Sequence, residues 1–117
     1  MIRFSSDQLA AAASSRFERQ LVEAIAAGRD EVRREVCTPE GLQNIRNQCR
    51  RAHAHGFRAE LDLARYVITA WLLGAEFDQR FAAIREVLAA PMLSPSAKAE
   101  ALERITATVL AQLTLGS

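Results

Sequence analysis

The pattern of apolar and polar positions along the chain predicts helices almost throughout. Ser5 and Gln8 have the spacing of a capping box, and Phe4 and Leu9 flank them as a hydrophobic staple, so a first helix is expected from this point. Apolar side chains then recur at the helical period until Gly28, which is a natural stop. The apolar positions of this first helix are Leu9, Ala13, Phe17, Leu21, Ala24 and Ile25.

Capping and glycine signals divide the rest of the chain into further helices. Thr38-Pro39 and Ser94-Pro95 each place a hydroxyl-bearing residue before a proline, which is typical of the first turn of a helix. A short helix is expected from Asp30 to about Val36, a third from Thr38-Pro39 to Gly56, and a fourth from about Ala59 to Leu73. The fifth expected helix carries Phe77, Phe81, Ile84 and Leu88, and the last carries Leu102, Ile105, Val109 and Leu113.

No segment alternates with period two for long enough to form a strand. The length of 117 residues is that of one domain with one hydrophobic core, and half of the residues are apolar. The prediction is therefore an all-α fold, with residues 1–117 forming a single domain as a compact bundle of five or six helices.

Charge and composition narrow the classes of partner. The formal net charge of +1 does not favour binding to nucleic acid or to an anionic membrane. We see neither a signal-peptide pattern nor an apolar window of membrane-spanning length, so a cytoplasmic location is expected. Cys37 and Cys49 have no CxxC or metal-binding spacing and are expected to be reduced thiols.

A basic cluster in the third expected helix is the first candidate site. Arg46, Arg50, Arg51 and Arg58 surround His53 and His55. Such a cluster is either an anion or phosphate-backbone site or a solvated helix face whose charge is favourable near a helix C-terminus. The absence of interleaved aromatic residues and of a glycine-rich loop favours the solvated face.

Enzymatic and metal chemistry find little support in the sequence. The histidines stand two apart, whereas metal-binding histidines on one helix usually stand three or four apart. Cys49 and His53 have the latter spacing, but a pair of ligands makes a weak site. Neither GxSxG nor HExxH occurs, so no catalytic residue, metal or cofactor is predicted.

The fourth expected helix is apolar nearly all round, which indicates a central position in the fold or an interface. Its polar residues Asp62, Arg65 and Thr69 fall on one stripe, and the spacing of Asp62 and Arg65 allows an ion pair. Together with Tyr66, the only tyrosine, Asp62 and Arg65 are interpreted as a structural polar core rather than an active site.

The segment GFRAELDLARYVITAWLLGAEFD at residues 56–78 resembles a family of small helical proteins that are encoded in bacterial type VI secretion gene clusters. The opening MIRFSSDQL and the arginine- and glutamate-bearing RFERQLV are also similar to that family. The chain departs from the pattern at Arg58, where a threonine or serine cap is usual, and at Gln79-Arg80, where an acidic, proline-containing loop is frequent. The residues that match are Gly56, Phe57, Glu60, Asp62, Leu63, Ala64, Arg65, Tyr66, Leu73, Gly74, Phe77, Asp78, Leu93, Ser94 and Pro95.

This resemblance implies a cytoplasmic accessory, either a co-chaperone or an adaptor, that binds a secretion effector, its chaperone or a spike protein. The expected contacts are the arginines Arg46, Arg50 and Arg51 and exposed apolar side chains near Phe77 and Phe81. Two other functions stay open: a cytoplasmic immunity protein that neutralises a toxin, and a small helical DNA-binding regulator. The oligomeric state is also open, and a symmetric homodimer is compatible with so leucine- and alanine-rich a chain.

Overall fold

The computed structural model describes the backbone of residues 6–115 and the side chains of residues 16–113. Within this range the chain forms seven helices and no strand, which confirms the all-α prediction. No helix in the described range combines the length and the apolarity that crossing a lipid bilayer demands. The helices are α1 (Ser6–Ala26), α2 (Asp30–Val36), α3 (Pro39–Ala54), α4 (Glu60–Leu73), α5 (Phe77–Arg80), α6 (Ala82–Ala89) and α7 (Pro95–Leu115).

The contacts between residues divide the chain into two units, residues 1–46 and residues 47–117. The first unit contains α1, α2 and the beginning of α3, and the second contains the rest of α3 and all later helices. The single domain remains a prediction.

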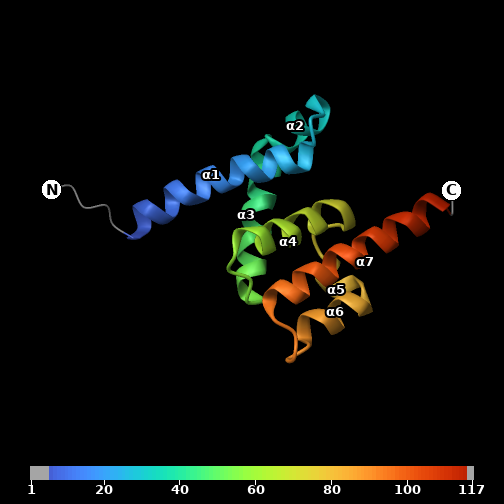
Figure 1. Cartoon of the computed structure of the whole chain (residues 1–117). Coiled ribbons are helices and arrows are strands. Elements are labelled where there is room, and N and C mark those ends of the chain that lie inside the picture. The colour runs from blue at the N-terminus through green and yellow to red at the C-terminus, as the bar shows by residue number, and fades with distance from the viewer. Residues whose placement is uncertain (1–5, 116–117) are drawn as a thin grey trace. The chain divides into compact units, whose positions relative to one another are not determined.

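In the first unit, α1 and α2 lie against one another (Figure 1). The buried side chains of α1 come as neighbouring pairs four residues apart, so the buried stripe leaves the predicted Ala24 exposed at its edge. Arg33 of α2 pairs with Glu23 of α1 at 2.9 Å. The predicted capping box, the staple, and the side chains of Leu9 and Ala13 lie outside the described residues. The buried pairs of α1 are Leu21 with Val22 and Ile25 with Ala26.

The junction between α2 and α3 confirms the predicted threonine cap. The Gly41 amide donates to Thr38 Oγ1 at 3.0 Å, which satisfies an otherwise unpaired N–H of the first turn. Gly41 also lies so close to the end of α2 that a Cβ atom added to it would stand 2.3 Å from the Val36 carbonyl oxygen. Because no side chain fits there, this close approach requires glycine.

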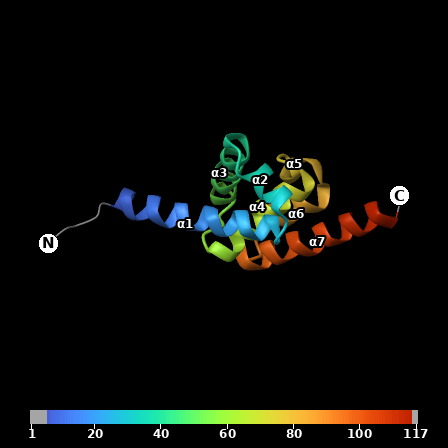
Figure 2. The ribbon, with the colours of Figure 1, turned by 90° about the horizontal axis from the view of Figure 1, so that it is seen from above.

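In the second unit, α4 and α7 run side by side and in parallel (Figure 1), with α5 and α6 in the connection between them and α6 packed on α7 (Figure 2). Ser94 confirms the second predicted cap, because its Oγ accepts the Ala97 amide at 3.2 Å. An aromatic cluster lies in the core, with ring centroids 5.7 Å apart for Phe57 and Tyr66 and 4.8 Å apart for Tyr66 and Phe77. Other buried core side chains are Leu63, Val67, Ala70, Ile84, Leu88 and Leu102.

The predicted fifth helix is two helices, which is why the described chain has seven helices rather than five or six. Phe81 takes an extended conformation, with φ −103° and ψ 116°, and separates α5 from α6. Its N–H donates to the Phe77 carbonyl at 3.4 Å, and its own carbonyl accepts the Arg85 amide at 3.0 Å. The apolar spacing predicted which side chains face the core. The same spacing is also compatible with two short helices separated by a break, so it could not distinguish them from one continuous helix.

The row of apolar side chains predicted for α7 is buried only in the N-terminal part of the helix. Leu102 is fully buried, Ile105 and Val109 are half-buried, and Leu113 is 66% exposed. The predicted helical period is therefore correct. The apolar row of α7, however, extends beyond the part of the helix that is buried by the described helices of the second unit.

Candidate functional site

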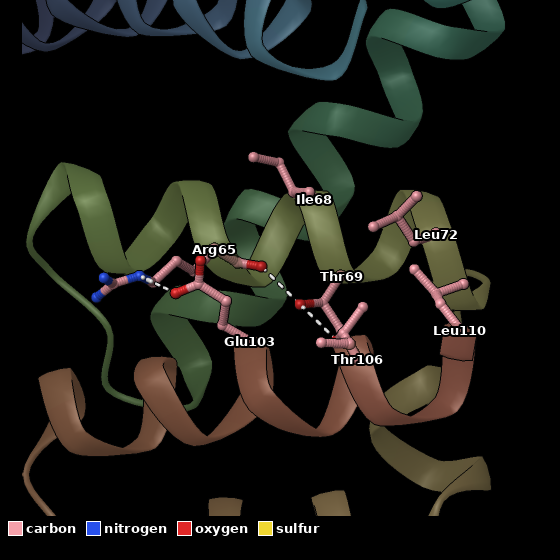
Figure 3. Close-up of a pocket in the computed structure, with 8 residues that line it drawn as sticks. Arg65, Ile68, Thr69, Leu72, Glu103, Thr106 and Leu110 are labelled. Atoms are coloured by element: carbon pink, nitrogen blue, oxygen red, sulfur yellow. Dashed lines mark hydrogen bonds and ion pairs between the residues drawn. The ribbon is translucent and has the colours of Figure 1, made fainter. Parts of the chain in front are cut away.

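A groove between α4 and α7, which we call the α4–α7 groove, is the candidate binding site (Figure 3). Its cavity volume is about 260 Å³, and it is partly open to solvent. Enclosed pockets for small ligands usually measure roughly 300–1,000 Å³ and bury most of the ligand. The α4–α7 groove is smaller and more open, so a side chain or helix edge of another protein suits it better. Its apolar lining consists of Ile68 and Leu72 from α4 and Ala107 and Leu110 from α7.

One end of the groove carries an ion-pair network (Figure 3). Arg65 Nε of α4 lies 3.1 Å from Glu103 Oε2 of α7. Arg65 Nη1 lies farther from Asp62 Oδ1, at 3.8 Å. Asp62 is buried and also accepts the hydroxyl of Ser96 at 3.0 Å. Glu103 is exposed to solvent over 65% of its side chain, so this end of the groove presents an accessible carboxylate.

Two threonines form the floor between the polar end and the leucines. Thr69 Oγ1 donates to the Arg65 carbonyl at 2.7 Å, and Thr106 Oγ1 donates to the Leu102 carbonyl at 2.7 Å. The two hydroxyl oxygens lie 3.4 Å apart. Each hydroxyl therefore donates its hydrogen bond to a carbonyl of its own helix. An apolar group of a ligand can cover the floor without leaving these hydroxyl donors unpaired.

A second polar cluster, the Asp78 cluster, joins α3, α4 and α5. Arg51 donates to Asp78 Oδ1, while the Tyr66 hydroxyl donates to Asp78 Oδ2 at 2.9 Å. His55 Nε2 lies 3.1 Å from the same Oδ2, and it must be the donor because an ionised carboxylate only accepts. Asp78 and Tyr66 are buried, whereas Arg51 and His55 are each exposed over about a third of the side chain.

The electrostatics of the Asp78 cluster favour a fixed protonation state. Burial alone would raise the pKa of the Asp78 carboxyl, but the hydrogen bonds from Arg51, His55 and Tyr66 outweigh burial and hold the pKa below its usual value. Burial, followed by the hydrogen bond to the Asp78 anion, raises the pKa of Tyr66 far above its ordinary value. Neutral tyrosine and ionised aspartate are therefore the stable forms over the neutral range.

No protein-family model, curated protein or solved structure matches this chain. The resemblance to accessory proteins of type VI secretion remains a prediction.

The arginines that were predicted to contact a partner protein each interact with another residue of the chain. Arg46 pairs with Glu18 of α1 at 2.7 Å, and Arg50 donates to Asn47 one turn earlier on α3. Arg51 is engaged by Asp78. The structure thus assigns each of these arginines a partner within its own unit.

The two phenylalanines that were predicted near a partner surface differ in exposure. Phe77 is fully buried and packs edge-on against Tyr66, so its prediction as a partner contact is wrong for this conformation of the chain. The reason is that Phe77 opens α5 on the side that faces α4. Phe81 is half-buried at the break between α5 and α6.

The predicted structural polar core, Asp62, Arg65 and Tyr66, is divided between the two sites. Arg65 lines the polar end of the α4–α7 groove and pairs with Asp62, which is buried and does not line the groove, whereas Tyr66 belongs to the Asp78 cluster. Sequence reasoning missed Asp78 as the acceptor that joins three helices. The available signal was its place in the FD pair that follows Gly74 in the family-like pattern.

Among the described residues, no three histidine, cysteine, aspartate or glutamate side chains lie close enough together to hold a metal ion. Cys37 is exposed and Cys49 half-buried, and neither forms a disulfide. His53 is used otherwise, because its Nδ1 accepts Arg58 Nη1 at 2.9 Å.

Proposed function

We propose that this chain is a non-enzymatic accessory protein, a co-chaperone or adaptor, that binds a type VI secretion effector or the chaperone of that effector. The α4–α7 groove is the contact surface in this proposal. The observation that carries it is an open apolar groove whose margin continues into exposed leucines, with Leu72 exposed over 47% and Leu113 over 66% of their surfaces. Contiguous exposed apolar surface of this kind marks protein-interaction sites.

The use of the polar side chains agrees with binding rather than catalysis. Asp78 is held by three donors in a structural role, and the threonine hydroxyls of the groove floor are bonded to their own helices. A nucleophile with an adjacent base and an orienting group would be the mark of covalent catalysis. The groove instead offers shape and apolar area, which are what a protein partner uses.

The experiment is co-expression of the tagged chain with the products of its neighbouring genes, followed by affinity capture. We expect one product to co-purify in a stoichiometric complex. Leu72→Lys places a charge in the groove and should lower the captured amount at least tenfold. Met92→Lys is the matched control, because Met92 is 94% exposed between α6 and α7 and does not line the groove.

Capture of no neighbouring product, in any pairwise co-expression, would contradict the proposal. A captured toxin whose growth inhibition is relieved by the chain would identify the immunity function instead. Salt-dependent binding to duplex DNA, without a protein partner, would identify the regulator.

A further inference from the structure

The α4–α7 groove is polar at one end and apolar at the other (Figure 3). At the polar end, the carboxylates of Asp62 and Glu103 share the single guanidinium of Arg65, so this group of three has a net negative charge. At the other end Leu72 and Leu110 form the walls, and the exposed Leu113 lies one turn further along α7.

The rows of side chains along the groove have the spacing by which helices pack. On α4 the row is Leu61, Arg65, Ile68 and Leu72, with intervals of four, three and four residues. On α7 the row is Glu103, Ala107 and Leu110, with intervals of four and three. Two parallel helices with such rows form two sides of a three-helix arrangement, and a third helix would fill the groove between them.

We propose that the occupant of the groove is one amphipathic helix of the partner protein, with a lysine or arginine placed against Glu103 and a leucine-sized side chain between Leu72 and Leu110. This inference rests on the proposed function and specifies the element that is bound. The argument for it is charge complementarity: the accessible carboxylate of Glu103 belongs to a group with an excess of negative charge.

The dimensions of the groove fix the spacing in the partner helix. Arg65 and Leu72 are seven residues apart on α4, which corresponds to about 10 Å along the helix axis. The cation and the large apolar side chain of the partner helix should therefore stand seven positions apart as well. Either orientation of the helix meets this requirement.

Two other charged residues lie near the polar end. Glu100 and Arg104 are both exposed on α7 and stand four residues apart, so their opposite charges face one another on the helix surface. Together they add no net charge to the group of Asp62, Arg65 and Glu103. The net charge of the side chains at the polar end of the groove therefore remains negative.

The probe is a designed helical peptide of about 20 residues with leucines at the three-and-four spacing and one lysine in the middle of the apolar row, seven positions from a leucine on either side. A matched peptide has glutamate in place of the lysine. Both are titrated against the full chain, the Glu103→Lys variant and the Glu86→Lys control, which makes the same charge change at an exposed position of α6.

We expect the unmodified chain to prefer the lysine peptide about threefold to fivefold, as partly exposed ion pairs allow. Glu103→Lys should reverse the preference, and Glu86→Lys should preserve it. Equal binding of the two peptides, or no binding of either, would overturn the inference. So would a dimer of the chain alone that Leu72→Lys dissociates, because a second copy would then occupy the groove.

The outcomes for the inference and for the proposed function can be told apart. If a neighbouring gene product is captured in a Leu72-dependent way while the charge exchange has no effect on peptide binding, the proposed function stands and the inference fails. If the peptide preference reverses as expected but no neighbouring product is captured, the groove binds such helices and the secretion context is wrong.

Discussion

At the scale of single residues, the carboxylate of Asp78 accepts hydrogen bonds from Arg51, His55 and Tyr66. Arg51 lies on α3, His55 just after the end of α3 and Tyr66 on α4, while Asp78 lies on α5. One side chain therefore links three helices of the second unit. Its removal would leave the buried Tyr66 hydroxyl without its acceptor, which costs more than the loss of one exposed hydrogen bond.

Substitutions in the Asp78 cluster should lower stability in a graded order. We expect Asp78→Ala to lower the free energy of unfolding by about 2–3 kcal/mol, since it leaves a buried hydroxyl and a part-exposed guanidinium unpaired. Tyr66→Phe should cost about 1–2 kcal/mol, because only one hydrogen bond to the carboxylate is lost. Urea denaturation followed by Trp71 fluorescence measures both. Equal losses in the two variants would contradict this account of Asp78.

The pKa shifts of the same cluster predict a decline of stability on both sides of neutrality. The lowered pKa of Asp78 contributes stability above its unfolded pKa of about 4, and this contribution is lost as the pH falls through the folded pKa. The raised pKa of Tyr66 contributes stability below its unfolded pKa of about 10 and is lost as the pH rises further. Stability should thus be highest between about pH 5 and pH 9.

Because the chain has one tyrosine, its ultraviolet titration reports Tyr66 alone. We expect tyrosinate absorbance to appear only together with alkaline unfolding, as shown by circular dichroism. In Tyr66→Phe the alkaline decline should be smaller while the acid decline persists. Free ionisation of tyrosine near pH 10 in the folded protein would show that the hydroxyl is not held as described.

At the scale of helices, apolar periodicity and capping signals predict where the helices lie. They predict poorly which apolar side chains of a helix are buried by neighbouring helices. Thr38 and Ser94 cap the helices expected of them, since a cap depends on residues that are close in sequence. The break at Phe81 was missed because an apolar side chain at the expected period can also occupy an extended position between two short helices. The exposure of Leu113 depends on where neighbouring helices end, which periodicity does not contain.

Two leucines of α7 test whether burial, rather than helical spacing, decides the contribution of an apolar side chain to stability. Leu102→Ala should lower the free energy of unfolding by about 2–4 kcal/mol, because it empties a fully buried position. Leu113→Ala should change it by less than about 0.5 kcal/mol, because that side chain is mostly exposed. Thermal and urea denaturation of the two variants give the comparison, and a large loss in Leu113→Ala would show that the end of α7 is covered in solution.

At the scale of the whole molecule, the division into two units raises the question of how they unfold. Gly41→Ala gives access to the first unit. Replacing a glycine inside a helix by alanine normally stabilises by about 0.5–1 kcal/mol, but here the added Cβ meets the Val36 carbonyl, and we expect a loss of about 1–3 kcal/mol. Glu40→Ala, at an exposed neighbouring position of α3, is the control and should be nearly neutral.

The readout compares two signals. Trp71 lies in the second unit, so its fluorescence reports that unit, whereas circular dichroism reports the helices of both. We expect Gly41→Ala to lower the urea midpoint seen by circular dichroism more than the midpoint seen by fluorescence. Coincident midpoints in the variant would instead support the single cooperative domain predicted from the chain length.

The candidate site was predictable only in part. The mostly apolar surface of α4 indicated a central or interfacial helix, and Asp62 and Arg65 were expected to pair. The groove itself depends on which helix lies beside α4, and the parallel partner α7 is distant in sequence. The arginines of α3 were proposed as contacts because they are close in sequence, but their individual ion-pair and hydrogen-bond partners were not foreseeable from spacing alone.

The parallel arrangement of α4 and α7 has a consequence for synthesis of the chain. Parallel neighbours cannot be joined by a tight turn, and α5 and α6 must be made before α7 can reach α4. A pairing of such high sequence separation forms late, after the entropy of closing the intervening loop has been lost. On the ribosome, α4 would emerge with its α7-facing side uncovered, and the groove would be absent until α7 follows. A partner that recognises the groove therefore distinguishes the folded second unit from a nascent or partly folded chain.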